Sequence, residues 1–210
     1  GNWELLDSGS RKLNELDRIV GYYKPNKSYF CYETMHNNIS KNITQIEQEI
    51  GNTQLVVVSK YRSLEELNEV YATGHRNFGE NRVQEAQERW VDLRPQYPDL
   101  TLHLIGPLQT NKVKEAVHLF DVIETVDRPK LVKALAAEMN KQNRPLPCFI
   151  QVNTGEEDQK AGILPSDLPD FLKLCREEGL NIIGLMCIPP VDEPAALHFA
   201  FLQKLAQAQG

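Results

Sequence analysis

Six short apolar segments, each followed by an amphipathic stretch, constrain the fold of this chain more than any other feature. The expected strands cover residues 55–60, 76–80, 101–106, 121–125, 147–153 and 180–188. The first of them, LVVVSK, is a continuous run rich in valine, as in a strand buried on both faces. Strands that alternate with helices form parallel βαβ units. The alternation fits a doubly wound sheet and a (β/α)8 barrel equally well.

The stretches between the strands carry helix periodicity and helix end signals. Ser63 and Glu66 form a capping box, and Gly74 is predicted to end the helix that follows. Asn81 is predicted to be the N-cap of the next helix, which runs to about residue 91. Asp127 is predicted to cap a later helix whose first turn contains a proline.

Residues 1–34 differ in character from the rest of the chain. They combine an amphipathic stretch at 5–20 with an aromatic, turn-rich segment, and the helix pattern with isoleucines at helical spacing begins after residue 35. We interpret 1–34 as an appendage of unknown role and 35–210 as the folded domain. A (β/α)8 domain typically needs about 250 residues, so a barrel built from 35–210 would be incomplete, with about six βα units.

An incomplete barrel has consequences for its two edge strands. Neither residues 1–34 nor the terminal helix has the pattern of strands seven and eight, so the first and sixth strands are expected to have unpaired edges. Because the helical pattern near residue 210 has no convincing cap, a fragment is one interpretation of the sequence. The chain is then expected to be prone to aggregation.

Charge, hydropathy and cysteine usage exclude several classes of protein. The net charge of −6 argues against a nucleic-acid binder that relies on electrostatics. No apolar run approaches the roughly 20 residues that cross a bilayer, so we expect a cytoplasmic protein without membrane contact. The cysteines form no CxxC pair and are interpreted as free thiols: Cys31, Cys148, Cys175 and Cys187. The five histidines have no metal-ligand spacing, so no metal site is expected.

Polar residues gather where the expected strands end. In parallel α/β folds this carboxyl edge is where ligands bind. Lys60 ends an apolar strand, and an amine desolvated there is a better nucleophile that suits a Schiff base. The alternative is a lysine that reaches out to solvent. The phosphate-binding patterns GxGxxG and Walker A are both missing.

Five segments together resemble the pyridoxal phosphate homeostasis protein family, the YggS/PROSC type. They are VVVSKYRS, GHRNFGENRVQEAQ, LHLIGPLQTNK, QVNTGEEDQKAGI and GLMCIPP, and they occur in the family's order over about residues 36–208. The most specific is HLIGPLQTNK. Leu102 and Leu104 depart from the family, which usually has aromatic residues at these positions.

The resemblance implies a fold and a cofactor. The fold would be a (β/α)8 barrel of the TIM type, like the N-terminal domain of alanine racemase. Pyridoxal 5′-phosphate (PLP) would be held as a Schiff base by Lys60, with Asn81 near the cofactor and with His103, Asn153 and Met186 lining the same barrel mouth. Lys160, in the loop after the fifth strand, is either a further lysine near this mouth or a solvated loop residue.

The resemblance also implies which contacts would be missing. The family's phosphate contacts lie in Gly-Met-Ser and Gly-Thr segments and on an arginine of its last strand, and none of these follows Gly210. A phosphate without such a cradle loses charge-assisted hydrogen bonds. We therefore expect the chain to bind the cofactor weakly.

Three functions remain open at this point. The first is a non-catalytic carrier of PLP in intracellular PLP homeostasis, with PLP-dependent apoenzymes as recipients and a monomeric state. The second is a PLP-dependent racemase or related enzyme, which needs a second base opposite the lysine. In alanine racemases that base is a tyrosine from a second domain, so we favour the carrier and expect no catalytic residue. The third is an unrelated barrel enzyme without a cofactor.

Overall fold

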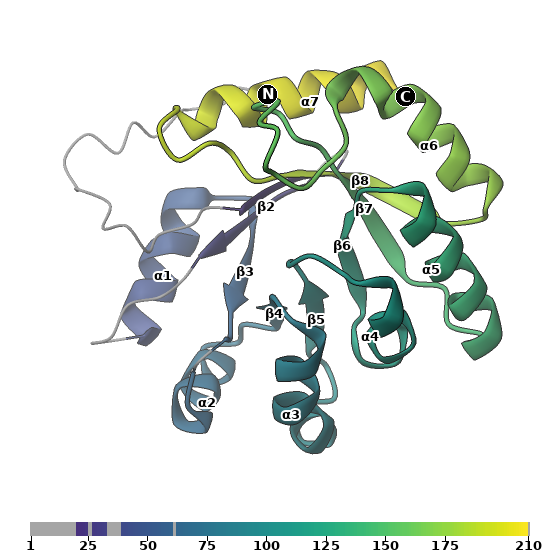
Figure 1. Cartoon of the computed structure of the whole chain (residues 1–210). Coiled ribbons are helices and arrows are strands. Elements are labelled where there is room, and N and C mark those ends of the chain that lie inside the picture. The colour runs from purple at the N-terminus through teal and green to yellow at the C-terminus, as the bar shows by residue number, and fades with distance from the viewer. Residues whose placement is uncertain (1–19, 25–26, 33–38, 61, 210) are drawn as a thin grey trace.

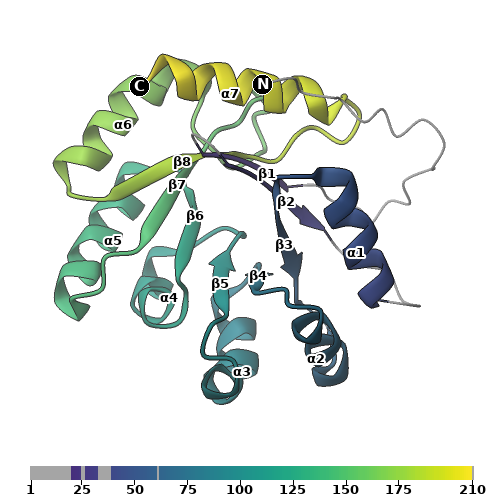
Figure 2. The same cartoon turned by 180° about the vertical axis from the view of Figure 1, so that it is seen from behind.

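A closed barrel of eight strands surrounded by helices forms the body of the molecule (Figures 1 and 2). The computed structural model describes residues 20–24, 27–32, 39–60 and 62–209, and side chains from residue 39 onward. Strand order follows chain order from β1 to β8, and β8 closes onto β1. Strands β3 to β8 are parallel, and each is followed by a helix. The predicted six βα units and the barrel are confirmed.

The strands are short and lie close to their predicted positions. Their bounds are β1 Val20–Lys24, β2 Lys27–Tyr32, β3 Gln54–Val58, β4 Asn77–Glu80, β5 Thr101–Leu104, β6 Val122–Val126, β7 Pro147–Gln151 and β8 Asn181–Cys187. The helices are α1 Ile39–Ile50, α2 Leu64–Ala72, α3 Val83–Leu93, α4 Val113–Leu119, α5 Pro129–Gln142, α6 Leu168–Glu177 and α7 Ala195–Ala208. Short 3-10 turns, Arg94–Gln96, Thr110–Lys112 and Pro165–Asp167, adjoin α3, α4 and α6.

The barrel is closed by a hairpin that the sequence did not predict. β1 pairs antiparallel with both β2 and β8, and β2 pairs parallel with β3. The expectation of unpaired edges, with no barrel strand from residues 1–34, was therefore wrong. The reason is that the edges of β3 and β8 present backbone donors and acceptors, and a segment rich in tyrosine can pair with both. Residues 1–19 and 33–38 lie outside the described residues, so a domain boundary at 34/35 stays a prediction.

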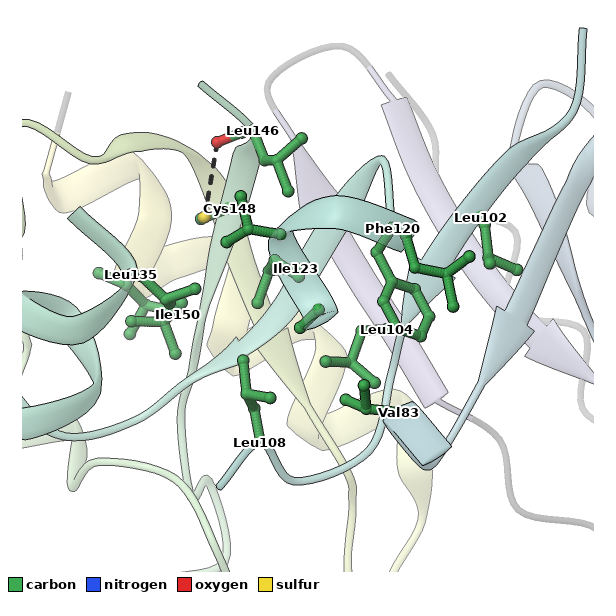
Figure 3. Close-up of a cluster of buried hydrophobic side chains, with 14 of the residues drawn as sticks. Val83, Leu102, Leu104, Leu108, Phe120, Ile123, Leu135, Leu146, Cys148 and Ile150 are labelled. Carbon is green, nitrogen blue, oxygen red and sulfur yellow. Dashed lines mark hydrogen bonds between the residues drawn. The ribbon is translucent and has the colours of Figure 1, made fainter. Parts of the chain in front are cut away.

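Two apolar layers follow from the alternation of side chains along the strands. The inner layer fills the barrel and consists of Val56, Val58, Ile105, Val122, Phe149 and Met186. The outer layer lies between strands and helices, and Figure 3 shows part of it, with Leu104, Phe120 and Ile150 buried together. Cys148, Cys175 and Cys187 are free and buried, and burial raises the pKa of each to about 12. The side chain of Cys31 lies outside the described part.

Helix ends confirm one capping prediction and correct two. Ser63 and Glu66 make both hydrogen bonds of the capping box of α2. The prediction for Asn81 was wrong, because α3 begins at Val83 with Arg82 at the N-cap position. The prediction for Asp127 was also wrong: Arg128 is the N-cap residue of α5, and its guanidinium binds the Asp127 carboxylate at 2.6 Å. No helix in the described part of the chain is long and apolar enough to span a bilayer.

Candidate functional site

Lys60 lies in the turn after β3, at the carboxyl end of the barrel, and is half-buried. The inward-facing residues of β3 are Val56 and Val58, so the same alternation places Lys60 on the barrel side. Ser59 points the other way, since its hydroxyl donates to the outward-facing carboxylate of Glu80 at 2.7 Å. Lys60 therefore lies at the mouth of the barrel, on the side that faces its interior.

Asn81 lies opposite Lys60, directly after β4. The register pairs Val58 with Gly79, and the amide of Ser59 donates to the carbonyl of Gly79 at 3.0 Å, so the next inward pair is Lys60 and Asn81. The Oδ1 atom of Asn81 is buried and has no hydrogen-bond partner among the described residues. A buried amide oxygen without a partner is uncommon in proteins. The side chain therefore does not cap the helix, and its oxygen is an acceptor to which the described residues supply no donor.

The chain holds Asn81 in place through the neighbouring strand. A Cβ atom at Gly106 would lie 2.0 Å from the backbone oxygen of Asn81, so only glycine allows this approach. The amide of Ile105 also donates to the carbonyl of Glu80 at 3.0 Å. These two contacts fix the end of β4 against the segment that follows β5.

His103 faces the barrel interior and is buried. Its Nδ1 atom lies 2.5 Å from Oε1 of Glu124, and its Nε2 atom lies 3.3 Å from Oδ1 of Asn77. Asn77 is the first residue of β4, so the ring extends toward the amino end of the strands, away from Lys60. The Oε2 atom of Glu124 is buried without a hydrogen-bond partner in the described part of the chain.

Asn153, Met186 and Lys160 lie on the β7 and β8 side of the mouth. The Asn153 amide donates to the carbonyl of Glu157 at 2.8 Å and accepts from its N–H at 3.2 Å, which holds the loop after β7 in shape. Met186 is fully buried in the inner layer. The ammonium of Lys160 lies 2.6 Å from the Glu157 carboxylate and 3.3 Å from the carbonyl of Pro189.

The predicted site residues therefore do not all lie at the same place in the barrel. It brings Lys60 and Asn81 together on adjacent strand ends, whereas His103 lies deeper and Asn153 supports a loop. Sequence reasoning missed the partners of Ser59, which are the carboxylate of Glu80 and the α3 side chains that bind it. The sequence did contain a signal for this arrangement. Glu80 is an acidic residue at an outward position of its strand, and the helix that follows carries Arg89 and Trp90.

The chemistry open to this mouth is that of an amine. A half-buried primary amine can condense with an aldehyde, and a neighbouring amide can orient the product by a hydrogen bond. Among residues 39–60 and 62–209 no three histidine, cysteine or acidic side chains gather in a way that could hold a metal ion.

Comparison with known proteins gives the same picture for the fold. The model of the alanine racemase N-terminal domain family matches residues 36–209. An alanine racemase of Clostridium difficile superposes with a TM-score of 0.66 over 94% of this chain and 50% of the racemase, at 11% identity, which shows the fold alone.

Proteins that are more similar to this chain include two with the same name and one of known structure. The pyridoxal phosphate homeostasis protein of Pasteurella multocida is 35% identical over 178 residues, which are 79% of this chain and 76% of the relative. The protein of that name from Vibrio cholerae is 38% identical over 181 residues, 82% of this chain and 76% of the relative. PipY of Synechococcus elongatus, solved with PLP bound, is 34% identical, covers 81% of each chain and gives a TM-score of 0.73. The chain therefore belongs to the pyridoxal phosphate homeostasis protein family, with the fold of the alanine racemase N-terminal domain.

Proposed function

We propose that this chain binds PLP as a Schiff base on Lys60 and serves intracellular PLP homeostasis as a carrier. The observation that carries the proposal is the position of Lys60, which faces the barrel mouth opposite Asn81. The names of the relatives and the PLP-bound structure of PipY support the choice of cofactor. The carrier acts as a cytoplasmic monomer that passes PLP to PLP-dependent apoenzymes.

The residues at the mouth fit PLP in two respects. PLP supplies an aldehyde that a primary amine captures reversibly, and Lys60 provides the amine. The buried Oδ1 atom of Asn81 lacks a donor in the described part of the chain, and a hydrogen-bond donor of the bound cofactor would satisfy it. Reversible capture at Lys60 would keep the aldehyde from other amines.

A racemase is the second candidate, and the described tyrosines favour the carrier. Racemisation requires a base on the face of the substrate opposite the lysine. Tyr71 and Tyr97 are the tyrosines whose side chains the structure describes, and both belong to the outer surface of the barrel, bonded to Asp99 and Asn68. Neither is placed to act as that base.

The test of the cofactor site is Lys60→Ala. We expect it to abolish PLP that borohydride traps on the protein, because the imine carbon needs a primary amine. Peptide mapping of the reduced wild-type chain should place the label on Lys60, and Lys112→Ala serves as the matched control that keeps it. Label found mainly on Lys160 or Lys112 would contradict the assignment.

The test of the carrier role is proton exchange on an amino acid. We expect the PLP-loaded chain to exchange the α-proton of alanine in deuterated water no faster than free PLP does, because neither tyrosine with a described side chain is placed to act as the second base. NMR follows this exchange directly. A rate well above that of free PLP would favour the racemase.

A further inference from the structure

We propose that Glu80 and Arg89 brace the loop that carries Lys60, and that they are positioning residues for its amine. The brace, as defined here, consists of Glu80 at the end of β4, Arg89 on α3, and their two contacts to the loop, Ser59 and the carbonyl of Arg62. Its functional meaning rests on the PLP site proposed above. Neither residue faces the barrel mouth, so both act through the loop.

Glu80 fixes the residue before Lys60. Its side chain is fully buried, and its Oε1 atom accepts from the hydroxyl of Ser59 at 2.7 Å and from the indole N–H of Trp90 at 3.0 Å. Ser59 is itself fully buried, and its amide is bonded to the carbonyl of Gly79. The backbone that enters Lys60 is thereby tied to β4 and, through Trp90, to α3.

Arg89 fixes the chain on the other side of Lys60. Its Nη1 atom donates to the carbonyl of Arg62 at 2.5 Å, and its Nε atom lies 3.3 Å from Oε1 of Glu80. One guanidinium thus connects the buried carboxylate to the far end of the loop. Lys60 lies between two anchored points, Ser59 and Arg62, that share the same ion pair.

The carboxyl group of Glu80 is buried and is contacted by several polar side chains at once. Burial raises the pKa of Glu80, while Ser59, Trp90 and Arg89 act in the opposite direction. Its second oxygen, Oε2, is buried without a hydrogen-bond partner in the described part of the chain. Replacing a buried ion pair by apolar residues is often neutral or stabilising. What the pair does provide is a contact on each side of Lys60, which fits a role in holding that residue in one conformation.

The experiment uses the full chain without cofactor, in Ser59→Ala, Glu80→Gln and Arg89→Lys variants. Ser59→Ala removes one hydroxyl and is the mildest change, so it remains informative if Glu80→Gln does not fold. Amide hydrogen exchange of the peptide over residues 59–63 reports how firmly the loop is held. Competitive acetylation by acetic anhydride, mapped by mass spectrometry, reports the reactivity of Lys60 relative to Lys112. Asp121→Asn, at the opposite end of the barrel, is the control for general destabilisation.

We expect about tenfold faster exchange at 59–63 and an altered Lys60-to-Lys112 labelling ratio in Ser59→Ala and Glu80→Gln. Arg89→Lys should be intermediate, because its ammonium cannot reach both partners. Asp121→Asn should change neither readout. If the brace variants lower the unfolding temperature but leave both readouts at wild-type values, the proposal is overturned. Borohydride trapping of PLP, run separately on the wild type, decides the proposed function alone.

Discussion

The imidazole of His75 lies buried between α1, α2 and β4. Its Nε2 atom is 2.8 Å from the carbonyl oxygen of Asn77, and its Nδ1 atom is 3.5 Å from the carboxylate of Glu47. Burial lowers the pKa of His75 below its ordinary value of 6.5, against the opposing influence of the Asn77 carbonyl and Glu47. The unfolded chain therefore binds this proton more readily than the folded chain.

A pH dependence of stability follows from this difference. Well above pH 6.5 both states are neutral at His75, and the contribution to stability is fully present. As the pH falls from 6.5 toward the lower folded pKa, the unfolded state takes up the proton and stability is lost by up to about 1.4 kcal/mol per pH unit. His75→Gln can still donate to the carbonyl of Asn77 and should reduce this loss. Urea unfolding at about pH 7.5 and 5.5 measures both slopes, and equal slopes would contradict the prediction.

Lys60 and Asn81 show which features of single residues can be predicted from the sequence and which cannot. The position of Lys60 at the carboxyl end of β3 was predictable because the run of valines in this strand ends two residues before it. Asn81 was predicted to be a helix cap because Asn followed three positions later by Gln is a local signature of one. In the structure the backbone of Asn81 lies against Gly106, in the segment after β5, and a contact with so distant a segment leaves no local trace in the sequence.

Among contacts between elements, Asp121 links β5 to two arginines that also bind the end of α4, at the amino end of the barrel. Its carboxylate accepts from Arg94 at 2.6 Å, from Arg144 at 3.0 Å and from the amide of Leu102 on β5 at 2.8 Å. The two arginines also donate to carbonyl groups at the end of α4. Burial lowers the pKa of Arg144, and Asp121 opposes this effect.

We expect Asp121→Ala to destabilise the fold by about 2–4 kcal/mol, because it leaves two half-buried guanidinium groups without their anion. Asp99→Ala is the matched control. Asp99 also binds an arginine, Arg76 at 2.7 Å, but its side chain is 56% exposed and solvent screens the pair, so its loss should cost clearly less than the loss of Asp121. Urea unfolding of both variants gives the comparison, and similar losses would argue against the prediction.

The elements themselves were mostly predictable. Periodicity located the six parallel strands and their helices because each signal lies within a few consecutive residues. The β1–β2 hairpin was missed because its pairing with β8 depends on a strand far away in the sequence. The amphipathic and aromatic pattern of residues 1–34 does not specify that partner.

For the whole molecule, the hairpin is the piece that closes the barrel between β3 and β8 (Figure 2). We expect deletion of residues 1–34 to expose both edges and to cause association, because unpaired strand edges template further pairing. Size-exclusion chromatography with light scattering would show higher oligomers. A deletion variant that stays monomeric and unfolds at the wild-type urea concentration would refute this role of the hairpin.

The place of β1 also determines when the barrel can close during synthesis. β2 can pair with β3 soon after both have emerged, but Tyr22 pairs with Met186, so β1 completes its pairing only after β8 has been made. Pairings between distant segments form slowly because they must overcome a large loop-closure entropy. Until β8 is in place, one edge of β1 has no partner strand in the barrel. Closure of the barrel therefore requires β8, and we expect it to be a late step of folding.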